Sequence, residues 1–402
     1  MDTIFVQTVW QIMEELRDAS QLEDALSRSL EILKKTFDCE GGIIWMLDDK
    51  TKRIIAVTSS GEMDFTGFSV GIGRGAIGET VGTGESQALY SDVIARLGIN
   101  FDVGSEPDIR NTLLVPIKTP NGGLGALQLI NKREGEFTPE DIKACENSCA
   151  IVALDIEDKG FTFHPFEDRK PIVQMRNIIK EFMNGEEIRR ILKGIDLDVY
   201  EGELVVVLGE SGCGKSTLLN IIGGMDRLTQ GQLLVEGKDM SNPTEAELTE
   251  YRREYIGFVF QSYNLMPNLS AYENIEFIAE ISDHPLDSLD TLSMVGLEDR
   301  ADRLPAALSG GQMQRVSIAR ALVKNPKIIL ADEPTAALDH ETSIKVLSVI
   351  ERIAKERGTT IIMVTHNPEI AKMANRVIKL RDGKIASIRV NLHPLKAEDL
   401  VW

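Results

Sequence analysis

The hydrophobic pattern of the N-terminal part of the chain is that of a mixed α and β domain. Apolar residues recur every three to four positions over 10–16 and 22–37, which predicts amphipathic helices. Apolar runs interrupted by turn residues predict two β-hairpins, 42–57 and 113–130. The sequence Thr-Pro-Glu-Asp at 138–141 predicts the start of a further helix, with threonine as N-cap. Helices flanking an antiparallel sheet indicate an α+β domain.

The pattern changes in the C-terminal part to short runs of consecutive apolar residues. Residues 204–208 and 328–331 are such runs, and they predict strands buried on both faces. Residues 217–222 are predicted to be helical. A buried strand followed by a loop and a helix is the repeating arrangement of an α/β domain.

The loop between that strand and that helix matches a phosphate-binding motif, Gly-x-x-x-x-Gly-Lys-Ser. Its glycines let the backbone curl and turn amide N–H groups toward phosphate oxygens. Lys215 is expected to add a positive charge for the β- and γ-phosphates, and Ser216 to ligate Mg²⁺. The predicted nucleotide-binding residues, which we name the phosphate loop, are Gly209, Glu210, Ser211, Gly212, Cys213, Gly214, Lys215, Ser216 and Thr217.

Two carboxylates, Asp332 and Glu333, directly follow the apolar run 328–331. They would lie at the carboxyl edge of a buried strand, where open α/β sheets bind ligands. Together with the phosphate loop, Asp332 is expected to hold Mg²⁺ through its water shell, and Glu333 to polarise the attacking water as general base. The combination predicts an ATPase.

Residues 308–315 read Leu-Ser-Gly-Gly-Gln-Met-Gln-Arg and lie about a hundred positions after the phosphate loop. With the motifs above, they make residues 170–388 resemble the nucleotide-binding domain of ABC transporters. We name 308–315 the signature segment. By this resemblance it contacts ATP bound to the opposite subunit, which implies a second copy of the chain as partner. The residues concerned are Ser309, Gly310, Gly311 and Gln312.

Four further positions match the family one by one. Gln261 resembles the glutamine that ligates Mg²⁺ and senses the membrane partner, and His366 resembles the histidine that contacts the γ-phosphate. Asp339 ends a stretch, 337–339, that resembles the loop that links the two active sites in the family. Phe182 stands where the family places an aromatic residue on adenine, although Tyr is more usual there. The resemblance thus implies the catalytic residues Lys215, Glu333 and His366, and the metal ligands Ser216, Gln261 and Asp332.

Within the family, residues 222–227, 252–261 and 264–269 are similar to the ATPases of lipoprotein-release and macrolide-export systems. This similarity implies an integral membrane permease subunit that docks near Gln261. Two alternatives stay open: a soluble, ligand-regulated ATPase without a membrane partner, and a binding module without catalysis. The presence of all the catalytic residues argues against the second.

The N-terminal part resembles a GAF domain, a small-molecule sensor fold. Its glycine-rich stretch 71–85 matches the middle segment of that fold. Part of the motif of cyclic-nucleotide-binding members is also present, but Ile142 occupies its final acidic position. The resemblance implies either a small-molecule ligand or a structural role in dimerisation. The residues that match the motif are Asn131, Lys132, Phe137 and Asp141.

The expected architecture is an α+β GAF-like sensor domain followed by an α/β P-loop ABC ATPase domain with a helical subdomain. We expect the sensor over 1–158, a linker over 159–171 and the nucleotide-binding domain over 172–402. Its aromatic, Gly- and Pro-containing composition suggests that the linker packs against another part of the protein.

Composition and charge limit the kinds of partner that the chain is expected to bind. The 402 residues carry a net charge of −19, of which −12 falls in residues 1–160, so nucleic-acid binding is not expected. No apolar run approaches the roughly 18 residues that span a bilayer, and no secretory signal is apparent. We therefore expect a cytoplasmic protein that reaches the inner face of the membrane through the permease. The four cysteines, expected to be buried and apolar in role, are Cys39, Cys145, Cys149 and Cys213.

Overall fold

The protein folds into two compact units. The first consists of Met1–Glu167 with Ser387–Leu392, and the second of Asp168–Ala386 with His393–Trp402. The computed structural model describes residues 10–15, 22–48, 50–62, 64–99, 107–158, 163, 165, 169–184 and 187–402. Most of the linker expected over 159–171 lies outside these described residues.

An antiparallel sheet in the order β3-β2-β1-β6-β5-β4 forms the centre of the first unit. Both predicted hairpins are confirmed, since β1 pairs with β2 and β5 with β6. Residues 10–15 are helical, as expected. The elements are β1 (Cys39–Asp48), β2 (Arg53–Ser60), β3 (Phe68–Gly71), β4 (Gln87–Leu89), β5 (Thr112–Thr119), β6 (Gly122–Lys132), α2 (Leu22–Thr36), α3 (Gly75–Thr83), α4 (Val93–Leu97) and α5 (Pro139–Asp158).

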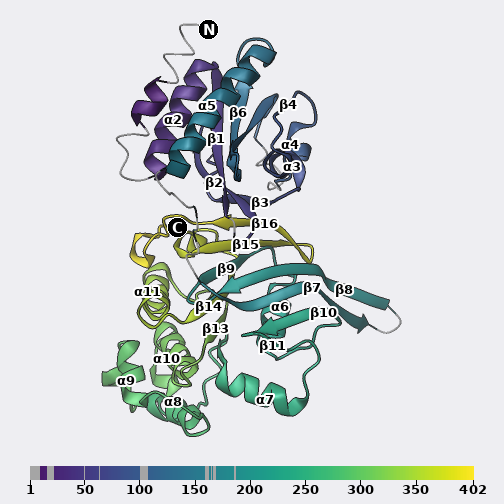
Figure 1. Ribbon diagram of the computed structural model, residues 1–402. Helices are drawn as coiled ribbons and strands as arrows, with labels where there is room; N and C mark the ends of the chain where they lie inside the picture. The colour runs from purple at the N-terminus through teal and green to yellow at the C-terminus, as the bar shows by residue number, and fades with distance from the viewer. Residues whose placement is uncertain are drawn as a thin grey trace. The chain divides into compact units, whose positions relative to one another are not determined.

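Helices cover both faces of this sheet: α2 and α5 lie on one face, and α3 and α4 on the other (Figure 1). Successive side chains of a strand point to opposite faces, so β1 contributes to both cores. Ile44 and Met46 pack in the core with α2 and α5, whereas Ile43 and Trp45 pack in the core with α3 and α4. The buried indole of Trp45 donates to Gln128 Oε1 at 3.0 Å. The apolar run of β1 is therefore explained by a sheet that is buried on both sides.

The start of α5 follows the prediction from the sequence. The Asp141 amide donates to Thr138 Oγ1 at 3.1 Å, and the Thr138 amide donates to Asp141 Oδ2 at 2.8 Å, which completes a reciprocal cap. Lys132, at the end of β6, forms an ion pair with Asp141 and lies 5.7 Å from the ring centroid of Phe137. Three residues of the motif noted in the sequence thus join β6 to α5.

A parallel sheet in the order β12-β13-β14-β9-β15 forms the centre of the second unit. A second, antiparallel sheet has the order β11-β10-β7-β8. The strands are β7 (Pro171–Asn184), β8 (Glu187–Tyr200), β9 (Leu204–Leu208), β10 (Gln230–Val235), β11 (Lys238–Asp239), β12 (Ile256–Val259), β13 (Ile328–Asp332), β14 (Thr360–Thr365) and β15 (Arg376–Arg381). A further strand, β16 (Lys384–Val390), is divided between the two units, since Ser387–Leu392 is counted with the first.

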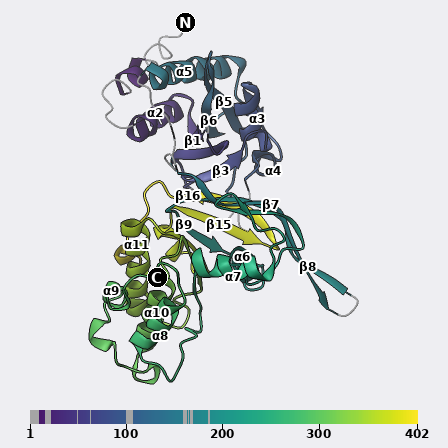
Figure 2. The same ribbon diagram turned by 60° about the horizontal axis from the view of Figure 1, so that its bottom comes forward.

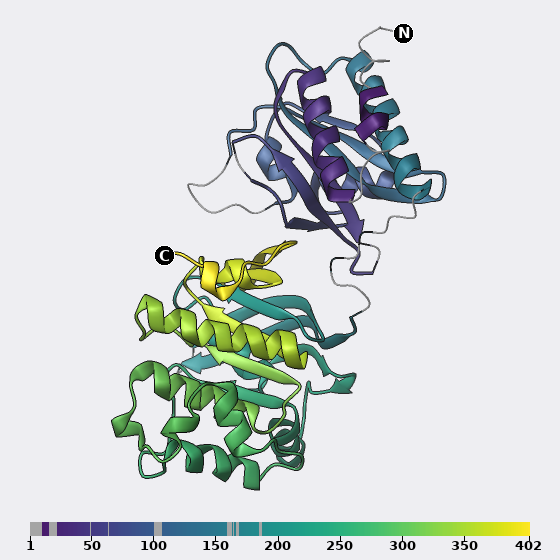
Figure 3. The same ribbon diagram turned by 90° about the vertical axis from the view of Figure 1, so that its left-hand side faces the viewer.

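The helices of this unit include one long helix against the parallel sheet and a separate group at one end. The long helix α11 lies along the parallel strands, as Figure 3 shows, and shares their core. Helices α8, α9 and α10 gather at one end of the unit, which confirms the predicted helical subdomain (Figures 1 and 2). The bounds are α6 (Lys215–Ile222), α7 (Glu245–Glu254), α8 (Ala271–Glu280), α9 (Ser288–Met294), α10 (Gly310–Leu322) and α11 (His340–Arg357), with short 3₁₀ turns at Glu298–Arg300, Pro305–Ala307, Ile370–Met373 and Ala397–Asp399.

Candidate functional site

The phosphate loop connects β9 to α6, and its glycines adopt backbone angles that other residues avoid. Gly212 has φ +79° and Gly214 has φ +110°, both in the left-handed region. A Cβ on Gly214 would lie 2.8 Å from Leu192 Cδ2, so a side chain would also be obstructed there. The backbone of the loop therefore turns tightly and leads directly into the first turn of α6.

Lys215 extends back into this loop. Its buried Nζ donates to the carbonyl oxygens of Gly209 at 2.7 Å and Glu210 at 3.0 Å. The positive charge is thus held inside the curl of backbone where the sequence predicts phosphate. The side chain of Cys213, within the loop, is buried with its Sγ 2.5 Å from the position of a Cβ on Gly209, and burial raises the pKa of its thiol.

Asp332 is the last residue of β13 and faces the first turn of α6. Ser216 Oγ donates to Asp332 Oδ1 at 3.3 Å. Burial is the main cause that raises the pKa of Asp332; the hydrogen bond from Ser216 opposes the shift, and the neighbouring charge of Glu333 adds to it. A hydroxyl and a carboxylate oxygen in contact form a pair of hard donors of the kind that Mg²⁺ prefers.

Glu333 and His366 form the second pair of the site. Glu333 Oε2 lies 2.6 Å from His366 Nδ1, and the imidazole is 66% exposed. Glu333 has φ +47°, which is unusual for a residue with a long side chain, and its amide donates to Val364 O at 3.0 Å. Asp332 is aligned with Val364 in the neighbouring parallel strand β14. The side chains of Glu333 and His366, which follow these two strands, therefore lie at the same edge of the sheet.

Gln261 and Phe182 lie on other elements. Gln261 is exposed and follows the end of β12, which is the neighbour of β13 in the sheet. Phe182 is on β7 and is 43% exposed. Lys180 Nζ lies 4.6 Å from the centroid of the Phe182 ring and also bonds Asp226 Oδ1 at 2.6 Å. One face of the aromatic ring is therefore covered by a cation that is itself fixed.

The signature segment forms the N-cap and the first turns of α10. Ser309 is the N-cap: the Gln312 amide donates to Ser309 Oγ at 3.3 Å, and the Ser309 amide donates to Gln312 Oε1 at 2.9 Å. This reciprocal cap adds a turn before the apolar part of the helix. Among the residues that the structure describes, no hydrogen bond or ion pair joins the signature segment to the phosphate loop.

Gly310 and Gly311 are needed for packing within the chain. A Cβ on Gly310 would lie 3.0 Å from Tyr263 Oη and 3.3 Å from Leu338 Cδ2. A Cβ on Gly311 would lie only 2.0 Å from Thr342 Cγ2 of α11. The signature segment is thus in direct contact with the loop that carries Asp339.

Thr342 is a site residue that the sequence reasoning missed. Its amide donates to Asp339 Oδ1 at 3.0 Å and its hydroxyl to Asp339 Oδ2 at 2.8 Å, so Asp339 is the N-cap of α11. The spacing Asp-x-x-Thr at a helix start was the signal that could have found it.

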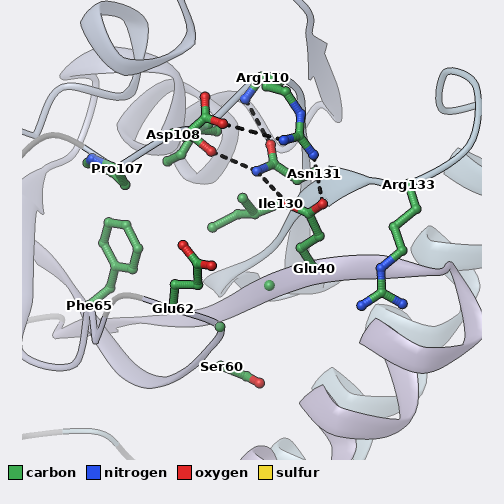
Figure 4. A pocket seen from close by; sticks show the side chains of 13 residues that line it. Glu40, Ser60, Glu62, Phe65, Pro107, Asp108, Arg110, Ile130, Asn131 and Arg133 are labelled. Atoms are coloured by element: carbon green, nitrogen blue, oxygen red, sulfur yellow. Dashed lines mark hydrogen bonds and ion pairs between the residues drawn. The ribbon is translucent and has the colours of Figure 1, made fainter.

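A pocket of about 720 Å³ lies in the first unit, at one end of the sheet (Figure 4). It is lined by residues from the start of β1, from the segment before β5, from the end of β6, and from the end of β2 and the loop that follows. Glu62 and Phe65 form one wall, and Pro107, Asp108 and Arg110 lie across from them. The lining combines carboxylates and guanidinium groups with apolar side chains; it consists of Glu40, Gly41, Ser60, Gly61, Glu62, Phe65, Pro107, Asp108, Ile109, Arg110, Ile130, Asn131 and Arg133.

Asn131 organises the polar wall of this pocket. Its Nδ2 donates to Glu40 Oε2 at 3.0 Å and to the Asp108 carbonyl at 2.7 Å, and its Oδ1 accepts from the Arg110 amide at 2.8 Å. Arg110 Nη2 in turn donates to Glu40 Oε1 at 2.7 Å, which lowers the pKa of that carboxyl. Asn131 thus has a local role distinct from the contacts of Lys132.

Family models match both units. The model described as ABC transporter matches residues 192–336, and the model described as GAF domain matches residues 19–157.

No helix in the described part of the chain has the length and apolar character needed to cross a bilayer.

Individual proteins are similar to more than half of the chain. A putative ABC transporter ATP-binding protein of Mycoplasma genitalium is 45% identical over 238 residues, 58% of this chain and 51% of that protein. The macrolide export ATP-binding/permease protein MacB of Escherichia coli (strain K12) is 44% identical over 220 residues, 54% of this chain and 34% of that protein. The chain thus spans about half the length, or less, of these curated relatives.

A solved ATP-binding cassette, dimeric in a post-hydrolysis state bound to ADP and Pi, is 41% identical with a TM-score of 0.52. The match covers 55% of this chain and 98% of that one. A second structure, titled as a dimeric bacterial ABC transporter cassette, has a TM-score of 0.51 and the same identity and coverage.

Proposed function

Because this chain belongs to the ABC transporter ATP-binding proteins and carries a GAF domain in its N-terminal part, we propose that it is the ATP-hydrolysing subunit of a transport complex. Two copies would dimerise around two ATP molecules and drive a separate membrane subunit. The nucleotide-binding domain is proposed over 172–402, the sensor over 1–158 and a linker between them.

The observation that carries the proposal is the convergence of one side-chain set at one edge of the parallel sheet. Lys215 and Ser216 begin the helix after β9. Asp332 ends β13 and Glu333 follows it, and His366 follows β14. Parallel strands bring their carboxyl ends together, and this edge is where such sheets bind ligands. We assign phosphate binding to the phosphate loop, water activation to Glu333, and orientation of that carboxylate and of the γ-phosphate to His366.

The donor set also fits the magnesium ion that accompanies ATP. Ser216 and Asp332 are already in contact, and Gln261 follows the strand next to β13. We assign these three oxygens to the metal, which would neutralise charge on the phosphates when bound. Phe182 is assigned to the adenine ring, with Lys180 behind it on the covered face.

The signature segment supports dimerisation. Within one chain it has no polar link to the phosphate loop among the described residues, yet its helix presents a capped N-terminus at Ser309, a favourable place for an anion. We propose that Ser309, Gly310, Gly311 and Gln312 close over ATP held by the second copy, with Asp339 beside them. The similar cassettes solved as dimers support this arrangement.

Replacing Glu333 with Gln tests the core of this proposal. We expect the variant to bind ATP, to lose steady-state hydrolysis and to accumulate as an ATP-bound dimer in analytical ultracentrifugation. Glu356→Gln, at an exposed acid near the other end of α11, is the matched control and should hydrolyse ATP normally. A Glu333→Gln protein that stays monomeric at saturating ATP would contradict the proposed mechanism in which two copies close around two ATP molecules.

The membrane partner is proposed from the relatives. One of them is named as an ATP-binding/permease protein, so its ATPase and permease belong together. We propose that the present chain docks a separate permease near Gln261, at the inner face of the membrane. Co-expression with candidate integral membrane proteins, followed by purification in detergent, should yield a stable complex. Purification of the chain alone from every such pairing would favour the ligand-regulated ATPase without a membrane partner.

The pocket of the GAF domain supports a regulatory role. Its mixed polar and apolar lining fits a small molecule, and we propose that such a ligand adjusts the ATPase rate. Glu62→Trp should partly fill the cavity, and Glu134→Trp places the same ring on another exposed position. ATPase rates are compared with and without a cell-extract fraction below about 1 kDa. A response that is identical in wild type and in both variants would exclude this pocket as the sensor.

A further inference from the structure

A tryptophan far along the chain from the site packs against its edge. The rings of His340 and Trp402 lie with centroids 4.5 Å apart and planes at 88°, an edge-to-face pair. His340 is the first residue of α11 and directly follows Asp339. Edge-to-face contacts are a favoured geometry for aromatic rings because the positive ring edge meets the negative ring face.

The segment 393–402 that carries Trp402 is anchored to α11 and to the 3₁₀ turn Ile370–Met373. The Ala397 amide donates to Glu351 Oε2 of α11 at 2.8 Å, and the Leu395 amide donates to Lys372 O at 3.0 Å. Ala397 and Leu400 are buried in the core that includes α11. These contacts hold the segment that places the indole against His340, although Trp402 itself is 42% exposed.

The first turn of α11 leads directly to the signature segment. Asp339 caps the turn through Thr342, and Thr342 Cγ2 leaves no room for a side chain at Gly311. A tilt of this turn would move Asp339 and would change the contact beneath Gly311. Trp402 and Gly311 are thus connected through a single helical turn.

We propose that Trp402 is a positioning residue: by holding the imidazole of His340, it fixes the first turn of α11 in the direction that lets Asp339 and the signature segment meet the second copy of the chain. The inference rests on the proposed ATP-dependent dimer. It adds a residue outside all the motifs, whose role is to keep the dimer-forming surface in shape.

The test compares three variants in the Glu333→Gln background of the full chain: Trp402→Ala, Trp402→Phe and Val401→Ala. Val401 is 77% exposed and serves as the matched control. We expect Trp402→Ala to raise the dissociation constant of the ATP-bound dimer two- to tenfold, on the scale of one aromatic pair. Trp402→Phe should restore most of the affinity. ATP affinity of the monomer, measured with a fluorescent analogue at low protein concentration, should stay unchanged.

Hydrogen exchange measured by mass spectrometry separates this inference from the dimer proposal. In ATP-free protein, Trp402→Ala should speed exchange of the Thr342 and Ser343 amides at least threefold, because both bond to Asp339. Val401→Ala should leave these amides unchanged. If the parent fails to dimerise, the proposed two-site mechanism is wrong while exchange still reports on the turn. Unchanged exchange, or an unchanged dimer constant in a parent that does dimerise, overturns the role of Trp402.

Discussion

Glu333 Oε2 and His366 Nδ1 lie 2.6 Å apart, although the two residues are separated by 33 positions in the chain. Two adjacent parallel strands bring them together, and the amide of Glu333 is tied to Val364 O. Glu333 combines this backbone bond with a positive φ of +47°, and its carboxylate contacts the imidazole.

Loss of this contact should slow hydrolysis more than it weakens ATP binding. We expect His366→Ala to lower kcat by at least tenfold with a smaller change in the KM for ATP, because the carboxylate loses the group that orients it. Steady-state phosphate release measures both constants. His284→Ala, at an exposed histidine of the same unit, should behave as wild type. A normal kcat in His366→Ala would remove His366 from the site.

Gly311→Ala should destabilise the packing of α10 on α11. The added methyl would lie 2.0 Å from Thr342 Cγ2, and the two bonds of Thr342 to Asp339 oppose its rotation away. We expect a loss of about 1–3 kcal/mol in the free energy of unfolding, measured by urea titration. Thr342→Ser removes the obstructing methyl and keeps the hydroxyl, so the double variant should recover at least half of the loss. Equal stability of the single and double variants would contradict this account.

Arg376 and Glu203 form a buried ion pair, with Nε and Oε1 2.8 Å apart and Arg376 only 3% exposed. Arg376→Met should cost about 3–5 kcal/mol in the free energy of unfolding, because it leaves the Glu203 carboxylate buried without its charge partner. Replacing both residues with Met should cost clearly less. Thermal or urea unfolding checks both variants, and an Arg376→Met protein as stable as the double variant would show that the pair is not the source of the loss.

Lys324 should make stability depend on pH. Burial lowers its pKa to about 8, with a smaller contribution from the positive charge of Arg252, while its Nζ donates to Ile256 O at 2.7 Å. The unfolded chain holds this proton up to about pH 10.4. Between these values the unfolded state binds more protons, so the free energy of unfolding should rise with pH, by at most about 1.4 kcal/mol per pH unit.

Lys324→Met should remove that rise, and Lys327→Met, at an exposed lysine nearby, should retain it. Urea titrations at several pH values between 7.5 and 10.5 provide the measurement. The same pH dependence in Lys324→Met and wild type would assign the rise to other groups.

Local sequence patterns were enough to predict most helices and strands and the candidate catalytic and metal-binding residues. The apolar runs placed β9, β13 and both hairpins of the first unit, and the Thr138 cap placed the start of α5. The motifs around Lys215, Asp332 and Glu333 could be read because such short sequences form one local structure with one chemistry. Propensity could not place the start of α10, because Gly310 and Gly311 disfavour helix and only the reciprocal cap of Ser309 with Gln312 offsets them.

The sequence by itself therefore determined the two kinds of domain, the phosphate loop and the acidic pair, since each depends on neighbours within a few residues. Only the tertiary structure decided which distant residues meet: Glu333 with His366, Gly311 with Thr342, Trp402 with His340, and Asn131 with the wall of the pocket. These contacts depend on strand order, helix packing and the path of the chain between them. Such long-range geometry leaves no periodic trace in a single sequence, because each partner by itself is an ordinary residue at the end of an ordinary element.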